Sequence, residues 1–262
     1  MKLLFAAVLA AGSWMIAGTA LAGASPVSIE IIDANGQVFR EFPVNARDGA
    51  LRSYLQAEKG ARYQVRVRNS TGERLGLVIA VDGRNIINGA KSELSGSEPM
   101  YVLAPYGTQD YAGWRANLDA VNEFYFTDWS DSYADAFGDR SARGVIAVAV
   151  YGEVAPPRPV YQPDDERERS ANSAGSPAAS APSSARSDSA AEKSAGTGYG
   201  DRRTDHAVQV EFVARPNADS RHFIKYEWRE TLCRKHLLEC GEKNRFWDES
   251  TLGFAPPPKG RR

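Results

Sequence analysis

The sequence predicts a mainly β protein: an antiparallel β-sandwich or jelly-roll-like domain with a tethered C-terminal β-hairpin. Three observations support this prediction. Apolar residues alternate with polar ones at a period of two, turn signals recur about every 8–12 residues, and a long polar segment divides the chain. With 262 residues, of which 42% are hydrophobic and 25% charged, the chain has the composition of a globular protein.

The chain begins with the features of a secretory signal peptide over residues 1–22. Lys2 is followed by an apolar run, and Ala20-Leu21-Ala22 has the small-x-small pattern of a cleavage site. An uncleaved N-terminal anchor is the alternative, because residues 3–22 are just long enough to span a bilayer. We expect cleavage before Gly23, no integral membrane span afterwards, and a periplasmic or secreted mature protein.

Residues 23–155 are predicted to form the β-sandwich domain. Val27, Ile29 and Ile31 alternate with polar residues, as do Tyr63, Val65 and Val67. Residues 77–81 and 145–151 are continuous apolar runs, which are typical of strands covered on both faces. Further β-prone pieces occur at residues 100–103, 109–114 and 124–126. Short helices are expected at residues 50–58 and 130–137, the second capped by Ser130 or Asp131.

The polar segment is expected to be a disordered tether over residues 156–198. From Asp164 to Gly198 there is no Ile, Leu, Val, Met, Phe, Trp, Tyr or Cys, so the segment has nothing to bury against the entropy of ordering it. The glycines of residues 196–200 (GTGYG) are interpreted as a flexible joint at its end.

Residues 199–262 are predicted to form a hairpin and a Cys-containing tail that packs on the first domain. The apolar faces of the hairpin are Val208, Val210 and Phe212 on one strand and Ile224, Tyr226 and Trp228 on the other. An isolated hairpin is only marginally stable, which is why packing against the sandwich is expected.

Seven short phrases stand out along the chain: VDGRNIING (81–89), MYVL (100–103), GWR (113–115), FYFT (124–127), DSYA (131–134), GVIAVAV (144–150) and GTGYG (196–200). Together, in their order and spacing, they resemble a group of exported bacterial proteins of unassigned function. The resemblance implies one β domain, a variable tether and a short returning tail. It implies no activity, cofactor or catalytic residue.

The cysteines are candidates for a disulfide. Cys233 and Cys240 enclose six residues, and seven positions on one helix would separate them by about 10 Å, so a bridge requires the helix to break near residues 239–241. Free thiols, or a zinc site that includes His236, are the alternatives. An oxidising compartment favours the disulfide.

Motifs of catalysis are sparse. No nucleophile elbow, phosphate loop, dinucleotide turn or EF-hand pattern occurs, and all three histidines lie in the C-terminal zone. Asp128, Asp131, Asp135 and Asp139 are interpreted as acidic loop surface. No catalytic residue, cofactor or metal site is predicted.

Aromatic residues are concentrated after position 100, and most are expected to fill the core between the sheets or cover its seam with the tail. Trp114, Trp129 and Tyr133 are the candidates if some rings face a ligand instead. A net charge of −1 gives no reason to expect nucleic acid as a partner. The sequence therefore predicts an exported envelope protein that acts by binding or assembly, with an unknown envelope protein or glycan as partner. An envelope hydrolase or a carbohydrate-binding protein that uses dispersed acids and aromatics is the alternative.

Overall fold

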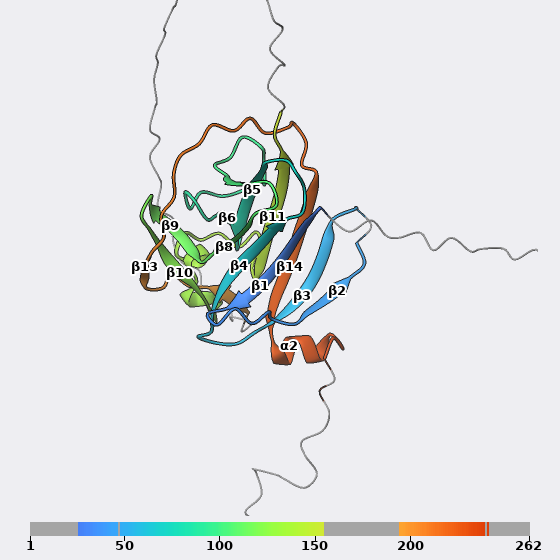
Figure 1. Cartoon of the computed structure of the whole chain (residues 1–262). Helices are drawn as coiled ribbons and strands as arrows, with labels where there is room; N and C mark the ends of the chain where they lie inside the picture. The colour runs from blue at the N-terminus through green and yellow to red at the C-terminus, as the bar shows by residue number, and fades with distance from the viewer. Residues whose placement is uncertain (1–25, 47, 155–193, 239, 241–262) are drawn as a thin grey trace, which may run out of the picture.

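The computed structural model describes residues 26–46, 48–154, 194–238 and 240, and in these residues the chain forms two β-sheets packed face to face (Figure 1). The first sheet has the order β1-β4-β10-β12, with β8 paired to β4, and β9 and β13 paired to β10. The second has the order β2-β3-β14-β11-β5-β6, with β7 paired to β5. The prediction of a mainly β sandwich is confirmed.

The strands of the first sheet are β1 (Val27–Asp33), β4 (Arg62–Asn69), β8 (Thr108–Tyr111), β9 (Gly113–Asn117), β10 (Ala120–Asp128), β12 (Ala195–Thr197) and β13 (Arg202–Thr204). Those of the second are β2 (Glu41–Val44), β3 (Leu51–Ala57), β5 (Leu75–Val81), β6 (Arg84–Asn85), β7 (Tyr101–Leu103), β11 (Val145–Gly152) and β14 (Ser220–Trp228). The helices are a 3-10 turn η1 (Trp129–Asp131), α1 (Tyr133–Ala136) and α2 (Arg229–Arg234).

The core lies between the sheets and follows the alternation seen in the sequence. Tyr63, Val65 and Val67 of β4 are fully buried, and the Tyr63 ring stacks on Phe126 with centroids 4.3 Å apart. Strand β5 is buried at every position because its second face is also covered. On that face Val78 packs with Ala149 and Tyr151 in a smaller cluster.

The predicted C-terminal hairpin is wrong, although residues 220–228 do form a strand. Strand β14 lies between β3, to which it is parallel, and β11, to which it is antiparallel. Both of its edges are therefore occupied, and residues 208–212 form no strand beside it. The parallel pair also makes the second sheet mixed rather than purely antiparallel.

The end of the predicted tether is also corrected. Residues 195–197 form β12, which pairs with Phe126–Asp128 of β10 and is buried at all three positions. Gly196 therefore lies in a strand, and the segment is not a flexible joint. Gly196 packs closely: a Cβ built on it would lie 2.6 Å from the Ser132 Cβ. Residues 156–193 of the tether, the signal peptide and residues 241–262 lie outside the described residues.

Two helix predictions differ from the structure. Residues 51–57 form β3 instead of a helix, with Ser53, Leu55 and Ala57 buried at a period of two beside β14. The segment 130–137 is divided into η1 and α1, and the cap is Ser132, whose hydroxyl accepts a hydrogen bond from the Asp135 N–H. Residues 51–57 are a strand because they pair with β14. Residues 130–137 are divided because Ser132 caps a separate helix.

Candidate functional site

A groove opens at the end of the sandwich where β3, β10 and β14 end and α2 begins. Its volume is about 1250 Å³. The residues that line it are Gln56, Ala57, Glu58, Lys59, Asp128, Arg143, Ser194, Lys225, Glu227, Trp228, Arg229, Glu230, Thr231, Arg234 and Lys235. It is larger than the pockets of about 300–1,000 Å³ that enclose small ligands, and it is partly open to solvent.

The floor and one wall of the groove follow from the parallel pairing of β14 with β3. Glu227 lies opposite Gln56 and Trp228 opposite Ala57, so both strands end together. The chain then turns into α2, which begins directly after Trp228. The fully buried side chain of Leu232 anchors this short helix to the sandwich.

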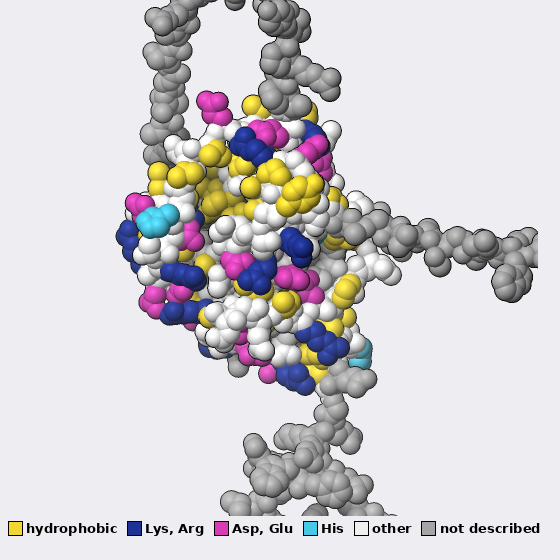
Figure 2. Space-filling view, in the orientation of Figure 1, with side chains coloured by type: hydrophobic (Ala, Val, Ile, Leu, Met, Phe, Trp, Pro, Cys, Tyr) yellow, Lys and Arg dark blue, Asp and Glu magenta, His cyan; other side chains and the backbone are white. Residues whose placement is uncertain are grey.

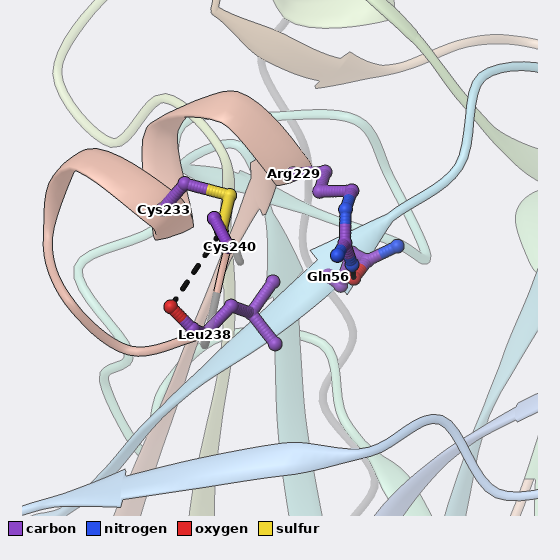
Figure 3. Close-up of a disulfide and its surroundings, with 5 residues drawn as sticks. All are labelled: Gln56, Arg229, Cys233, Leu238 and Cys240. Atoms are coloured by element: carbon purple, nitrogen blue, oxygen red, sulfur yellow. Dashed lines mark hydrogen bonds between the residues drawn. A yellow bond between two sulfur atoms is a disulfide. The ribbon is translucent and has the colours of Figure 1, made fainter. Parts of the chain in front are cut away.

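The disulfide holds the chain that follows α2. Cys233 and Cys240 are bridged, with their Cα atoms 5.5 Å apart (Figure 3). The helix ends at Arg234, and His236 has a φ of 56°, so the chain reverses earlier than the break expected near residues 239–241. Figure 3 also shows Arg229 beside Gln56, whose Oε1 accepts a hydrogen bond from the Arg229 guanidinium at 3.3 Å.

The groove carries more positive than negative charge. Six of its lining residues are Lys or Arg and four are Asp or Glu, an excess of two positive charges. Two ion pairs lie within it: Lys59 with Asp128, and Lys225 with Glu227 at 3.6 Å. The hydrogen bond to Asp128 raises the pKa of the exposed Lys59 ammonium, which stays protonated at neutral pH.

The remaining cations lack carboxylate partners within the described part of the chain. These are Arg143, Arg229, Arg234 and Lys235. Aromatic rings support two of them: Arg143 lies 5.0 Å from the centroid of Trp129, and Lys235 lies 5.6 Å from that of Tyr54. A guanidinium held by a ring is restrained while its N–H groups remain able to bind an anion.

The aromatic residues singled out in the sequence do not form a ligand platform. Trp114 is 2% exposed and its indole N–H donates to the Gly198 carbonyl; Trp129 is 8% exposed and donates to the Asp135 carboxylate. Tyr133 is half-buried, with its ring 4.3 Å from that of Trp114. Both tryptophans are buried: Trp114 belongs to the core between the sheets, and Trp129 lies in η1 with its N–H bound to Asp135. Neither ring faces a ligand. The aromatic residue on the groove is Trp228, which is half-buried.

A buried polar network, which the sequence did not reveal, lies behind the groove. The Asp82 carboxylate is fully buried and accepts hydrogen bonds from the Tyr226 hydroxyl and from the backbone N–H groups of Gly144 and Thr197. The Thr197 hydroxyl in turn lies 2.7 Å from the hydroxyls of both Tyr226 and Tyr63. Burial raises the pKa of Asp82 to about 6 and that of Tyr226 well above its usual range.

The acids and histidines of the sequence analysis are not brought together. Asp128 pairs with Lys59, whereas Asp135 accepts from Trp129 and Asp139 from Ser141. Within the described ranges, no group of three or more His, Cys, Asp or Glu side chains could hold a metal ion. Among the same residues, no helix has the length and apolar character needed to cross a membrane.

In comparisons with known proteins, no protein family, no curated protein and no solved structure matches this chain. The groove and its charges are therefore the basis for assigning a function.

Proposed function

We propose that the protein is an exported binding module of the cell envelope whose groove holds a segment of an anionic glycan. The observation that carries the proposal is the set of four cations in the groove, Arg143, Arg229, Arg234 and Lys235, without carboxylate partners among the described residues. Guanidinium groups bind carboxylate, phosphate and sulfate groups through paired N–H donors.

The shape of the groove supports a polymer as ligand. A partly open groove of about 1250 Å³ has room for several units of a chain. The ring of Trp228 packs partly against the core, and its exposed part lies among the charged residues, where it could contact a sugar ring. An acidic peptide would use the cations but not this ring, which is why a glycan is favoured.

Export is the second part of the proposal. It is supported by the signal-peptide features of residues 1–22 and is consistent with the Cys233–Cys240 disulfide, since such bridges persist in oxidising compartments. N-terminal sequencing of the protein from envelope or culture-medium fractions should begin at Gly23, and a mature protein that retains Met1 would contradict cleavage.

Isothermal titration calorimetry of the mature chain tests the binding. The probe is an oligogalacturonate, whose sugars carry carboxylates, and the comparison is a neutral galacto-oligosaccharide of equal length. We expect binding of the anionic probe only, weakening as salt rises because exposed charges are screened. Binding of poly-glutamate as tight as that of the anionic sugar would favour an acidic peptide instead.

A pair of double variants assigns the binding to the groove. Arg229→Gln with Arg234→Gln removes two groove cations and should weaken binding about tenfold, or about 1.4 kcal/mol. The matched control, Arg202→Gln with Arg221→Gln, removes the same charge from two exposed arginines on β13 and at the other end of β14. Equal losses in both double variants would show a general charge effect and contradict the groove.

Chromatography of the titrated mixture distinguishes binding from hydrolysis. A binding module leaves the oligogalacturonate intact, so chromatography of the mixture should recover its full length after prolonged incubation. Shortened products that disappear in the Arg229→Gln, Arg234→Gln variant would favour the envelope hydrolase.

A further inference from the structure

The segment that joins β13 to β14 arches over the top of the sandwich in Figure 1, and its middle is a strand sequence without a strand partner. Residues 208–212 read Val-Gln-Val-Glu-Phe, the alternation typical of a β-strand. No helix, strand, turn or bend occurs in these five residues. Within the described chain, none of their backbone N–H groups donates a hydrogen bond.

Both ends of this segment are anchored to the sandwich. Before it, the Ala207 N–H donates to the Leu118 carbonyl at 2.7 Å; after it, the Val213 carbonyl accepts from the Val154 N–H at 2.8 Å. The Arg74 guanidinium also donates to the Glu211 carbonyl at 2.8 Å. The backbone between the anchors is thus restrained before any partner arrives, which lowers the entropy cost of pairing.

The side chains of the segment are unusually exposed for apolar residues. Val208 is 83% exposed, Val210 54% and the adjoining Val213 65%. Phe212 is half-buried and packs on Gly76, where a Cβ would lie 2.6 Å from its ring. Figure 2, in the same orientation, shows hydrophobic side chains gathered below the arch. Unpaired backbone beside exposed valines is the kind of edge that binds another strand.

We propose that residues 208–212 pair antiparallel with the same residues of a second copy, about a two-fold axis at Val210. In this register Val208 of one chain faces Phe212 of the other, and Gln209 faces Glu211. Apolar side chains meet apolar ones, and the glutamate meets a neutral amide that donates hydrogen bonds. The segment is therefore complementary to itself, as a two-fold interface requires.

Neighbouring registers lack this complementarity. An axis at Glu211 sets the two glutamates directly opposite each other, and like charges in that position are destabilising. An axis at Gln209 still lets Val210 face Val208, but it sets Glu211 against Ala207 and Phe212 against His206. The charged residue then faces an apolar one, and Phe212 has no apolar partner. Self-complementarity of charge and apolar pattern favours a second copy over a strand of another protein.

Sedimentation velocity of the full mature chain at increasing concentration tests the dimer. We expect a monomer–dimer equilibrium that Val210→Glu shifts toward monomer by at least tenfold in dissociation constant, because two glutamates then face each other at the axis. The control is Val38→Glu: Val38 is also 54% exposed, and it lies between β1 and β2. Equal thermal melting temperatures show that both variants fold. A monomer at all concentrations, or a dimer insensitive to Val210→Glu, would overturn the proposal.

Cross-linking tests the register. Val210→Cys brings two thiols together at the axis, so it should form a disulfide-linked dimer under mild oxidation that reductant separates. Glu211→Cys faces Gln209 of the partner rather than its own counterpart, so it should cross-link at least tenfold more slowly. Equal rates for the two variants would contradict the axis at Val210. A dimer that forms only with a strand peptide of another protein would contradict the second copy as occupant.

Discussion

The hydroxyl of Tyr226 in β14 donates a hydrogen bond to Oδ1 of Asp82, 144 residues earlier in the chain, at 2.6 Å. The same carboxylate holds the backbone N–H of Thr197 in β12 at 2.8 Å and that of Gly144 at 2.7 Å. One buried side chain therefore connects the end of β5 with the start of β11 and with strands β12 and β14. The backbone N–H groups of Thr197 and Gly144 would be left unsatisfied without it, so Asp82 fixes how the two ends of the sequence meet.

The hydroxyl of Thr197 is expected to stabilise the fold through Tyr63 and Tyr226. Thr197→Val keeps the side-chain volume but removes the hydroxyl, which leaves the buried Tyr63 hydroxyl without its partner. We expect the free energy of unfolding to fall by about 2 kcal/mol. Urea denaturation measures it, with Thr204→Val at an exposed position of β13 as control. Equal stabilities of the two variants would show that the network contributes nothing.

The stability of the protein should depend on pH through Asp82. Its folded pKa is about 6, raised by burial, against about 4 in the unfolded chain. Between these values the folded state holds a proton that the unfolded state releases, so stability from this group is full below pH 4 and is lost as pH rises through 6. The loss is about 3 kcal/mol.

The comparison with Asp82→Asn isolates this effect. His222 acts in the opposite direction, because burial lowers its pKa and the unfolded state then gains protons as pH falls below about 6.5. The variant retains His222 and lacks the titrating carboxylate. The difference in unfolding free energy between wild type and variant should therefore widen from pH 6 to pH 4. A constant or narrowing difference across that range would refute the buried titration.

Gly196 should be intolerant of a side chain. A Cβ there would lie 2.6 Å from the Ser132 Cβ and 3.2 Å from the Trp129 Cα, so Gly196→Ala should cost about 2 kcal/mol through overpacking. Gly49→Ala is the control, since it meets no atom within 4 Å and costs only about 1 kcal/mol for its positive φ. Thermal melts measure the stability of both variants. An unchanged melting temperature for Gly196→Ala would support the first interpretation of residues 196–200 as a flexible joint.

Residues 23–154 should not fold alone. Without β14, β3 keeps only β2 as a neighbour and β11 keeps only β5. We expect the truncated chain to show no cooperative thermal transition by circular dichroism, in contrast to the mature chain of residues 23–262. A truncated chain that melts at the same temperature would make the C-terminal strands an independent element.

Local patterns were sufficient to predict much of the sandwich. Val27, Ile29 and Ile31 report one buried face directly, and the apolar run of residues 145–151 reports a strand covered on both sides. These features depend only on side-chain periodicity. Residues 224–228 were predicted as part of a strand for the same reason. Their neighbours in the sheet were not predicted, because strands far apart in the sequence leave no local pattern that shows they pair.

The groove could not be predicted from the sequence for a similar reason. Lys59, Arg143 and Arg229 come from three distant segments, and each alone is an ordinary surface charge. Only the cysteine pair signalled that the chain near residue 235 is held in place. The aromatic surplus did not locate the groove, since Trp114 is buried in the core and Trp129 is buried in η1. Trp228, which lines the groove, had been interpreted as a hairpin residue.

Mapping by nuclear magnetic resonance tests the proposed function most directly. Amide chemical shifts of the mature chain are followed while oligogalacturonate is added. We expect the largest changes at Lys59, Arg143 and residues 228–235, around the groove, and we expect the Arg229→Gln, Arg234→Gln variant to abolish them. Changes centred away from these residues, or none at ligand concentrations in the millimolar range, would contradict an anion-binding groove.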